Sequence, residues 1–215
     1  MRLKPLSWAF AALISLTGPV AQAEEAEHPR WISAGGALTE WIASLGGAEN
    51  LVAVDTTSAH VAGAQQLPNV GYQRQLAAEG VLALAPDLLI GSEEMGPPPV
   101  LEQLQRAGVQ VERLSAAANV DTLSETVTRL GQLLNKPELA QQQLTQFNQR
   151  IDSLQTRIQN AQKTHTAPRV LLVFGQGGGN PLVAGQDTIG DWLIKQAGGD
   201  NIAPHQNFRA LSTEA

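Results

Sequence analysis

Short apolar runs alternate with segments of helical periodicity over the first half of the chain. Short continuous apolar runs are typical of buried strands, whereas apolar residues spaced three and four positions apart are typical of amphipathic helices. Strands that alternate with helices predict a mostly parallel sheet. The strands are expected at 31–34, 51–55, 87–91 and 109–111, and the helices between them at 38–45, 77–84 and 100–107.

A long stretch from 121 to 163 has helical periodicity throughout. Asp121 is expected to cap its start. Pro137 is expected to end one helix and begin another, because proline lacks the amide hydrogen that a helix interior uses. We interpret residues 121–165 as a linker helix between two lobes, with a break near Pro137. Its two apolar stripes are Leu123, Val127, Leu130 and Leu134, then Leu144, Phe147, Ile151, Leu154 and Ile158.

The alternation of strand and helix starts again after the linker. A strand is expected at 170–174, and a helix that begins near residue 189 is expected to end at Gly198. Two phrases of the first half recur there in the same order, and we expect each pair to occupy the same structural setting. A repeated order of phrases indicates a duplicated lobe. The phrase at 46–51 recurs at 198–202, and the phrase at 74–80 recurs at 209–215.

The predicted fold is therefore α/β, with two Rossmann-like lobes of mostly parallel sheets joined by a long helix. The first lobe is expected at 24–120 and the second at 166–215. The first copy of the repeat continues to about residue 115, whereas the second stops one residue after Glu214. We therefore expect the second lobe to be truncated.

The first 23 residues have the pattern of an export signal. Arg2 and Lys4 precede a short apolar run, and Ala21 and Ala23 form a small-x-small cleavage site. The apolar run is too short to span a bilayer. We expect cleavage after about Ala23 and an exported mature chain that starts near Glu24.

Charge and residue content exclude several functions. Removal of residues 1–23 changes the formal net charge from −6 to −8, so the chain lacks the basic surface of a nucleic-acid binder. The absence of cysteine excludes disulfides, thiolate metal sites and cysteine nucleophiles. Ser33 and Ser92 have no histidine or acid at an interpretable distance, which argues against a hydrolase. The histidines share no metal-ligand spacing, so no zinc site is expected at His28, His60, His165 or His205.

Tyr72 is the only tyrosine of the chain, and it lies between Gly71 and Arg74. A phenolate oxygen is an axial ligand for ferric haem. A phenol titrates near about 10 in water, so it needs a nearby positive charge, which a ferric ion and a guanidinium supply. Arg74 is also suited to a carboxylate of a ligand. From the residues alone, a ligand contact and an ordinary packed aromatic ring both remain open for Tyr72.

The stretch 70–80, followed by 82–87, resembles the periplasmic haem-binding proteins of bacterial haem ABC transporters. These proteins belong to the helical-backbone class of solute-binding proteins. The resemblance covers essentially the whole mature chain. The Gly-Tyr-x-Arg phrase is its more specific part, whereas Leu-x-Pro-Asp is common to the wider class. The resemblance implies that Tyr72 is the axial ligand of a transported haem b, that Arg74 lies beside it, and that the chain is not an enzyme.

The resemblance also implies roles for residues outside this phrase. Some family members bind haem through a histidine on the second-lobe loop, where this chain has Gln176. That difference implies tyrosine-only coordination, with Gln176 as a hydrogen-bonding residue near the ligand or as a loop residue only. The wider class docks on its permease through one acidic residue per lobe, and Glu79 and Glu214 match those positions. The alternative for each glutamate is a solvated surface carboxylate.

The function predicted from the sequence is capture of haem and its delivery to an inner-membrane ABC permease with its ATPase, with an outer-membrane haem receptor upstream. One alternative is a receptor for another iron chelate, such as a siderophore, or for a corrinoid, on which Tyr72 would only stack. The other alternative is an extracytoplasmic enzyme or a haem chaperone that works without a transporter.

Overall fold

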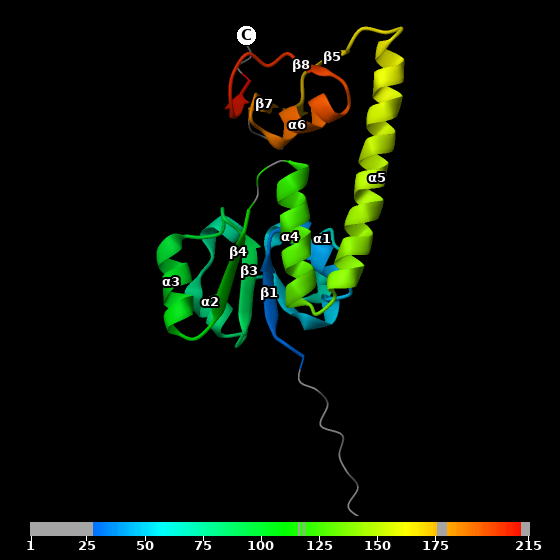
Figure 1. Ribbon diagram of the computed structural model, residues 1–215. Helices are drawn as coiled ribbons and strands as arrows, with labels where there is room; N and C mark the ends of the chain where they lie inside the picture. The colour runs from blue at the N-terminus through cyan, green and yellow to red at the C-terminus, as the bar shows by residue number, and fades with distance from the viewer. Residues whose placement is uncertain (1–27, 116, 118, 176–179, 212–215) are drawn as a thin grey trace, which may run out of the picture.

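A computed structural model of the chain describes residues 28–115, 117, 119–175 and 180–211 (Figure 1). The predicted signal segment, Gln176 and Glu214 lie outside the described residues.

The first lobe contains a four-stranded sheet in which every pair of neighbours is parallel. Its strand order is β2-β1-β3-β4. The chain adds β2 on one side of β1 and then β3 and β4 on the other side, so the strand order reverses at β1. The predicted parallel sheet and the helices that connect its strands are confirmed, with ends shifted by a few residues. The elements are β1 (Trp31–Ala34), α1 (Gly36–Ser44), β2 (Leu51–Val54), α2 (Ala78–Leu82), β3 (Leu88–Ser92), α3 (Pro98–Arg106) and β4 (Gln110–Leu114), with short 3-10 helices at Ala48–Asn50, Thr56–Ser58, Ala64–Gln66 and Gln73–Gln75.

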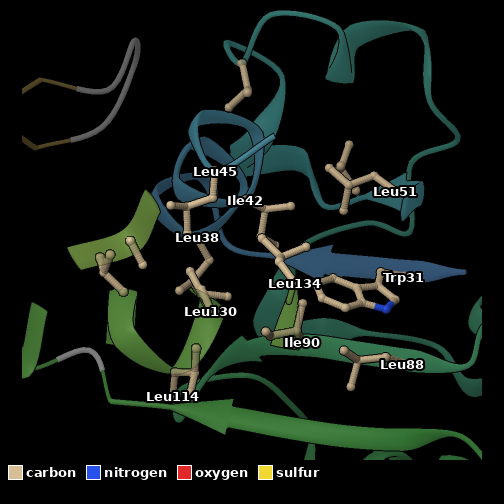
Figure 2. Packing of buried hydrophobic residues seen from close by; sticks show 14 of the residues in the cluster. Trp31, Leu38, Ile42, Leu45, Leu51, Leu88, Ile90, Leu114, Leu130 and Leu134 are labelled. Carbon is tan, nitrogen blue, oxygen red and sulfur yellow. The ribbon is translucent and has the colours of Figure 1, made fainter. Parts of the chain in front are cut away.

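Buried side chains cover both faces of this sheet, because successive residues of a strand point to opposite faces. Leu88 and Ile90 belong to one cluster, together with residues of α1 (Figure 2). Leu89 belongs to the other cluster, together with residues of α2 and α3. Helices on both faces of a parallel sheet make the three-layer α/β architecture that the sequence predicts.

The connection between the lobes consists of two helices, α4 (Val120–Leu133) and α5 (Pro137–Gln162). Asn119 caps α4, because its side-chain oxygen accepts a hydrogen bond from the Thr122 amide at 2.7 Å. The predicted cap at Asp121 is therefore wrong, and that residue lies in the first turn. The new helix begins at Pro137, the proline at which the sequence predicts one.

Helix α5 begins against the first lobe and extends to the second (Figure 1). Leu144 is buried in the first-lobe core, whereas Leu154, farther along the same apolar stripe, is 47% exposed. At the far end, the Gln162 amide donates to the Gly198 carbonyl at 3.2 Å. Among the described residues, no helix combines the length and apolar character that crossing a membrane requires.

The second lobe differs in strand pairing from the sequence prediction. Strand β5 (Arg169–Val170) pairs in parallel with β8 (Asp200–Asn201). The other three strands form an antiparallel sheet of order β6-β7-β9, and α6 packs against β7 and β8. These elements are β6 (Val173–Phe174), β7 (Leu182–Ala184), α6 (Ile189–Gln196) and β9 (Phe208–Ala210).

The prediction of a single strand at 170–174 is wrong, because the backbone changes partner within it. The Val170 carbonyl accepts from the Ile202 amide at 3.0 Å, which continues the pairing with β8. The Leu172 carbonyl accepts from the Ala184 amide at 3.0 Å, on the side of β7. The apolar run is therefore divided into two strands that belong to two sheets.

The two repeated phrases do not behave alike. Gly46 follows α1 and leads towards β2, and Gly198 follows α6 and leads into β8, so the first pair has the same setting. Arg74 lies in a 3-10 helix, whereas Arg209 lies in β9. The expected common setting is therefore wrong for the described part of the second phrase, because Arg209 is held in an extended strand by pairing with Val183.

Candidate ligand-binding site

A cavity of about 390 Å³ lies between the two lobes. Its first-lobe wall is built mainly from α1, α4 and the loops that follow β1, β3 and β4, at the carboxyl edge of the parallel sheet. Ligands bind at this edge in open α/β sheets, next to the point where the strand order reverses. The lining residues are Gly35, Gly36, Ala37, Leu38, Trp41, Gln73, Ser92, Glu94, Ser115, Ala117, Asn119, Thr122, Leu123, Thr126, Ile189 and Trp192.

Large apolar side chains from both lobes line this cavity. Trp41 and Leu123 come from the first lobe and the linker, and Ile189 and Trp192 come from α6. An apolar cavity with a few polar groups at its edge is the usual form of a small-molecule site. The geometry therefore supports a binding site for a mainly apolar ligand.

A buried polar network fixes the loop between β1 and α1, which forms part of the cavity wall. The Asp55 carboxylate is fully buried and accepts hydrogen bonds from the Gly35 amide at 3.1 Å and the Ser58 hydroxyl at 2.8 Å. The Thr57 hydroxyl donates to Asp55 and accepts from the Gly36 amide at 2.8 Å. A satisfied buried network of this kind holds a backbone in one position.

Gly36 lies where no side chain fits. A Cβ atom on this residue would lie 2.5 Å from the Thr57 carbonyl oxygen. The close approach of the two backbones, together with the Asp55 network, gives the cavity a rigid edge. Nothing in the local sequence pattern identifies this network, because its members come from two connections far apart in the chain.

Tyr72 lies in the loop that precedes the 3-10 helix Gln73–Gln75, and the residue is 40% exposed. Tyr72 is not among the residues that line the cavity, but its neighbour Gln73 is. The loop is held in place from outside, since the Gly96 amide donates to the Gln73 carbonyl at 3.0 Å and the Leu76 amide donates to the Gly96 carbonyl at 2.9 Å. The phenol therefore lies beside the cavity on a fixed loop.

Arg74 forms an ion pair with Glu94, which lies two residues after β3 and lines the cavity. The hydrogen bond from Arg74 to Glu94 raises the pKa of the guanidinium above its usual value, and the electrostatic interactions with Glu94 and then Tyr72 add to this. Tyr72 directly precedes the 3-10 helix that contains Arg74. The structure brings Tyr72, Arg74 and Glu94 together at one edge of the cavity.

The remaining predicted residues lie elsewhere. Glu79 is exposed in the first turn of α2 and does not line the cavity. Gln176 and Glu214 lie outside the described residues. Within the described part of the chain, no group of three or more histidine, aspartate or glutamate side chains is placed to hold a metal ion.

Sequence reasoning missed Trp41, Trp192, Glu94 and Asn119 as lining residues. The signal that identifies two of them is their position at the carboxyl ends of strands: Glu94 follows β3, and Asn119 follows β4. The two tryptophans have no such signal. They lie at apolar positions of helices, and such positions predict residues that pack in a core.

Comparisons with known proteins agree with this architecture. The model of the periplasmic binding protein family matches residues 32–215. A periplasmic haem-binding protein of Pseudomonas aeruginosa is 53% identical with a TM-score of 0.82, over 86% of this chain and 66% of that structure. The haem-binding protein HutB of Vibrio cholerae is 38% identical with a TM-score of 0.75, over 87% of this chain and 71% of that structure.

A curated relative, the vitamin B12-binding protein of Pectobacterium atrosepticum, is 32% identical over 90% of this chain and 69% of its own length. The chain thus spans about two thirds of the length of the relatives that it matches. The family predicted from the Gly-Tyr-x-Arg phrase is confirmed, and this chain belongs to the periplasmic binding protein family.

Proposed function

We propose that this protein captures haem in the periplasm and delivers it to an ABC importer of the inner membrane, formed by a permease and its ATPase. The solved structures that support this proposal are periplasmic haem-binding proteins with 53% and 38% identity. The role requires binding and release only, so we assign no catalytic residue to the chain.

The observation that carries the proposal is the placement of Tyr72 and Arg74 beside an apolar cavity between two lobes. In this role, Tyr72 binds the ferric iron through its phenolate oxygen. The ferric ion is the main charge that stabilises the phenolate, and Arg74 adds a second positive charge near it. Trp41 and Trp192 provide flat apolar surfaces that suit the porphyrin ring.

Three further residues complete the proposal. Gln176 is assigned a hydrogen bond near the bound haem, in place of the histidine of some family members. Glu79 and Glu214 are assigned to docking on the permease, one from each lobe. The exposure of Glu79 on α2 supports its part of this assignment, since a docking carboxylate must reach an arginine on the partner.

A corrinoid is the second candidate ligand, because a vitamin B12-binding protein is 32% identical over most of this chain. In that case, Tyr72 would stack on the ligand and would not coordinate its metal. A competition titration of hemin against cobalamin and a siderophore separates these ligands. We expect hemin to displace the other two.

The test of the haem assignment is a hemin titration of the wild type and of Tyr72→Phe, followed by visible absorption. Because Tyr72 is the only tyrosine, this change leaves no phenol in the protein. We expect loss of the phenolate-to-iron charge-transfer band and an affinity at least about tenfold lower, which corresponds to about 1.4 kcal/mol. Equal affinity with an unchanged band would reject Tyr72 as the ligand.

A further inference from the structure

We propose that Glu94 competes with the carboxylates of the cargo for Arg74, so that cargo binding requires exchange of the Arg74–Glu94 ion pair. This inference rests on the proposed function, in which the cargo is an iron porphyrin with two carboxylate side chains. Glu94 is then a residue that lowers affinity and favours release.

The position of Glu94 supports this role. It is the only charged residue among the described residues that line the cavity. Its partner Arg74 does not line the cavity. The Glu94 carboxylate is therefore the member of the ion pair that lies on the cavity wall. The two residues come from separate loops, which the hydrogen bond from Gly96 to Gln73 ties together.

The exposure of the pair makes the exchange feasible. The side chain of Arg74 is 51% exposed and that of Glu94 is 47% exposed. Ion pairs between half-exposed side chains contribute little to stability, because water solvates both charges when they separate. The guanidinium presents a planar fork of donors that fits a carboxylate of the cargo as well as it fits Glu94.

The guanidinium of Arg74 cannot pair fully with Glu94 and with a carboxylate of the cargo at the same time. Removal of the Glu94 charge therefore frees Arg74 for the cargo. We expect Glu94→Gln to bind hemin about threefold to tenfold more tightly than the wild type.

The experiment is a double-mutant cycle on hemin affinity with the wild type, Glu94→Gln, Arg74→Ala and the double variant. The proposal expects the gain of Glu94→Gln to vanish when Arg74 is absent. Glu102→Gln is the matched control, because Glu102 is an exposed carboxylate on α3 that pairs with Arg106 and does not line the cavity. This control removes the same charge and should leave affinity unchanged.

A second ligand tests whether cargo carboxylates are the competing group. With an iron porphyrin whose two carboxylates are esterified, Glu94→Gln should show no gain. An unchanged or weaker hemin affinity in Glu94→Gln, a gain that persists without Arg74, or an equal gain with the ester would each overturn the inference while the haem assignment stands. A wild type that binds no hemin overturns the proposed function and this inference with it.

Discussion

Trp41 and Trp192 line the same cavity from helices of different lobes, Trp41 from α1 and Trp192 from α6. An indole ring offers a large flat apolar face, and its burial against a ligand contributes more than that of most side chains. The cavity therefore has one large apolar contact from each lobe.

Trp192→Ala should weaken hemin binding by about tenfold, because a large apolar surface no longer leaves water when the cargo binds. Fluorescence quenching by hemin and absorption titration measure this effect. Leu193→Ala is the control, since Leu193 is 50% exposed on the same helix and does not line the cavity. Equal affinities of the Trp192 variant and the wild type would contradict the contact.

Glu79→Lys should reduce haem uptake by cells several-fold and leave hemin affinity unchanged. The reason is that an exposed charge pair guides docking on a partner, whereas Glu79 does not reach the cavity. Growth on hemin as the iron source measures uptake, and titration of the purified protein measures affinity. Glu102→Lys, which reverses a charge on α3, is the control for net charge. Normal uptake by the Glu79 variant would argue for a chaperone that works without the transporter.

Asp191→Asn should destabilise the second lobe by about 1–2 kcal/mol at neutral pH. Asp191 is buried, and hydrogen bonds from Lys195 and Asn201, at 2.7 and 3.1 Å, hold its charged form. The hydrogen bond from Lys195 is the main cause that lowers the pKa of Asp191 below its usual value of 3.8. Its stabilising contribution is therefore complete above that usual value and is lost as the pH falls through the lowered pKa.

Denaturant unfolding at several pH values tests this prediction. The stability difference between the wild type and Asp191→Asn should be constant above about pH 5 and should shrink as the pH falls below about 4. Lys195→Ala is the companion variant, since it leaves the buried Asp191 carboxylate without its main partner and should also destabilise the lobe. A stability difference that does not change with pH would show that the charge of Asp191 is not the cause.

Gly36→Ala should destabilise the protein by about 1–3 kcal/mol, because the added methyl group overlaps the Thr57 carbonyl oxygen. The shift of the cavity edge should also lower hemin affinity. Gly80→Ala is the matched control, because a Cβ atom on that α2 residue meets nothing within 4 Å. Thermal unfolding of the two variants gives the comparison, and equal melting temperatures would show that the loop is not rigid.

The first lobe was predictable because its strands are continuous apolar runs and its helices have clear spacing. The cap of α4 was misplaced because Asn119 and Asp121 are both good capping residues, and only the geometry of the Thr122 amide distinguishes them. The prediction of one strand at 170–174 was wrong because the two short halves of this segment pair with different strands. An apolar run does not show which strand each residue pairs with.

The candidate site was predictable only where residue type carried the information. A single tyrosine beside an arginine identified Tyr72 and Arg74 as candidates. The ion pair between Arg74 and Glu94 was not predictable, because it joins two loops that meet only through the order of strands in the sheet. Trp192 was missed because it lies at an apolar position of α6, and such positions are typical of residues that face a core.

Helix α5 contains 26 residues without interruption and is therefore about 39 Å long. A continuous helix of this length is stiff. We therefore expect the two lobes to tilt relative to each other through small angles and not to open by a wide hinge motion. If an importer contacts both lobes, as we propose, the distance between its two contact points is then nearly the same with and without cargo. We therefore expect discrimination between the two forms to occur after docking.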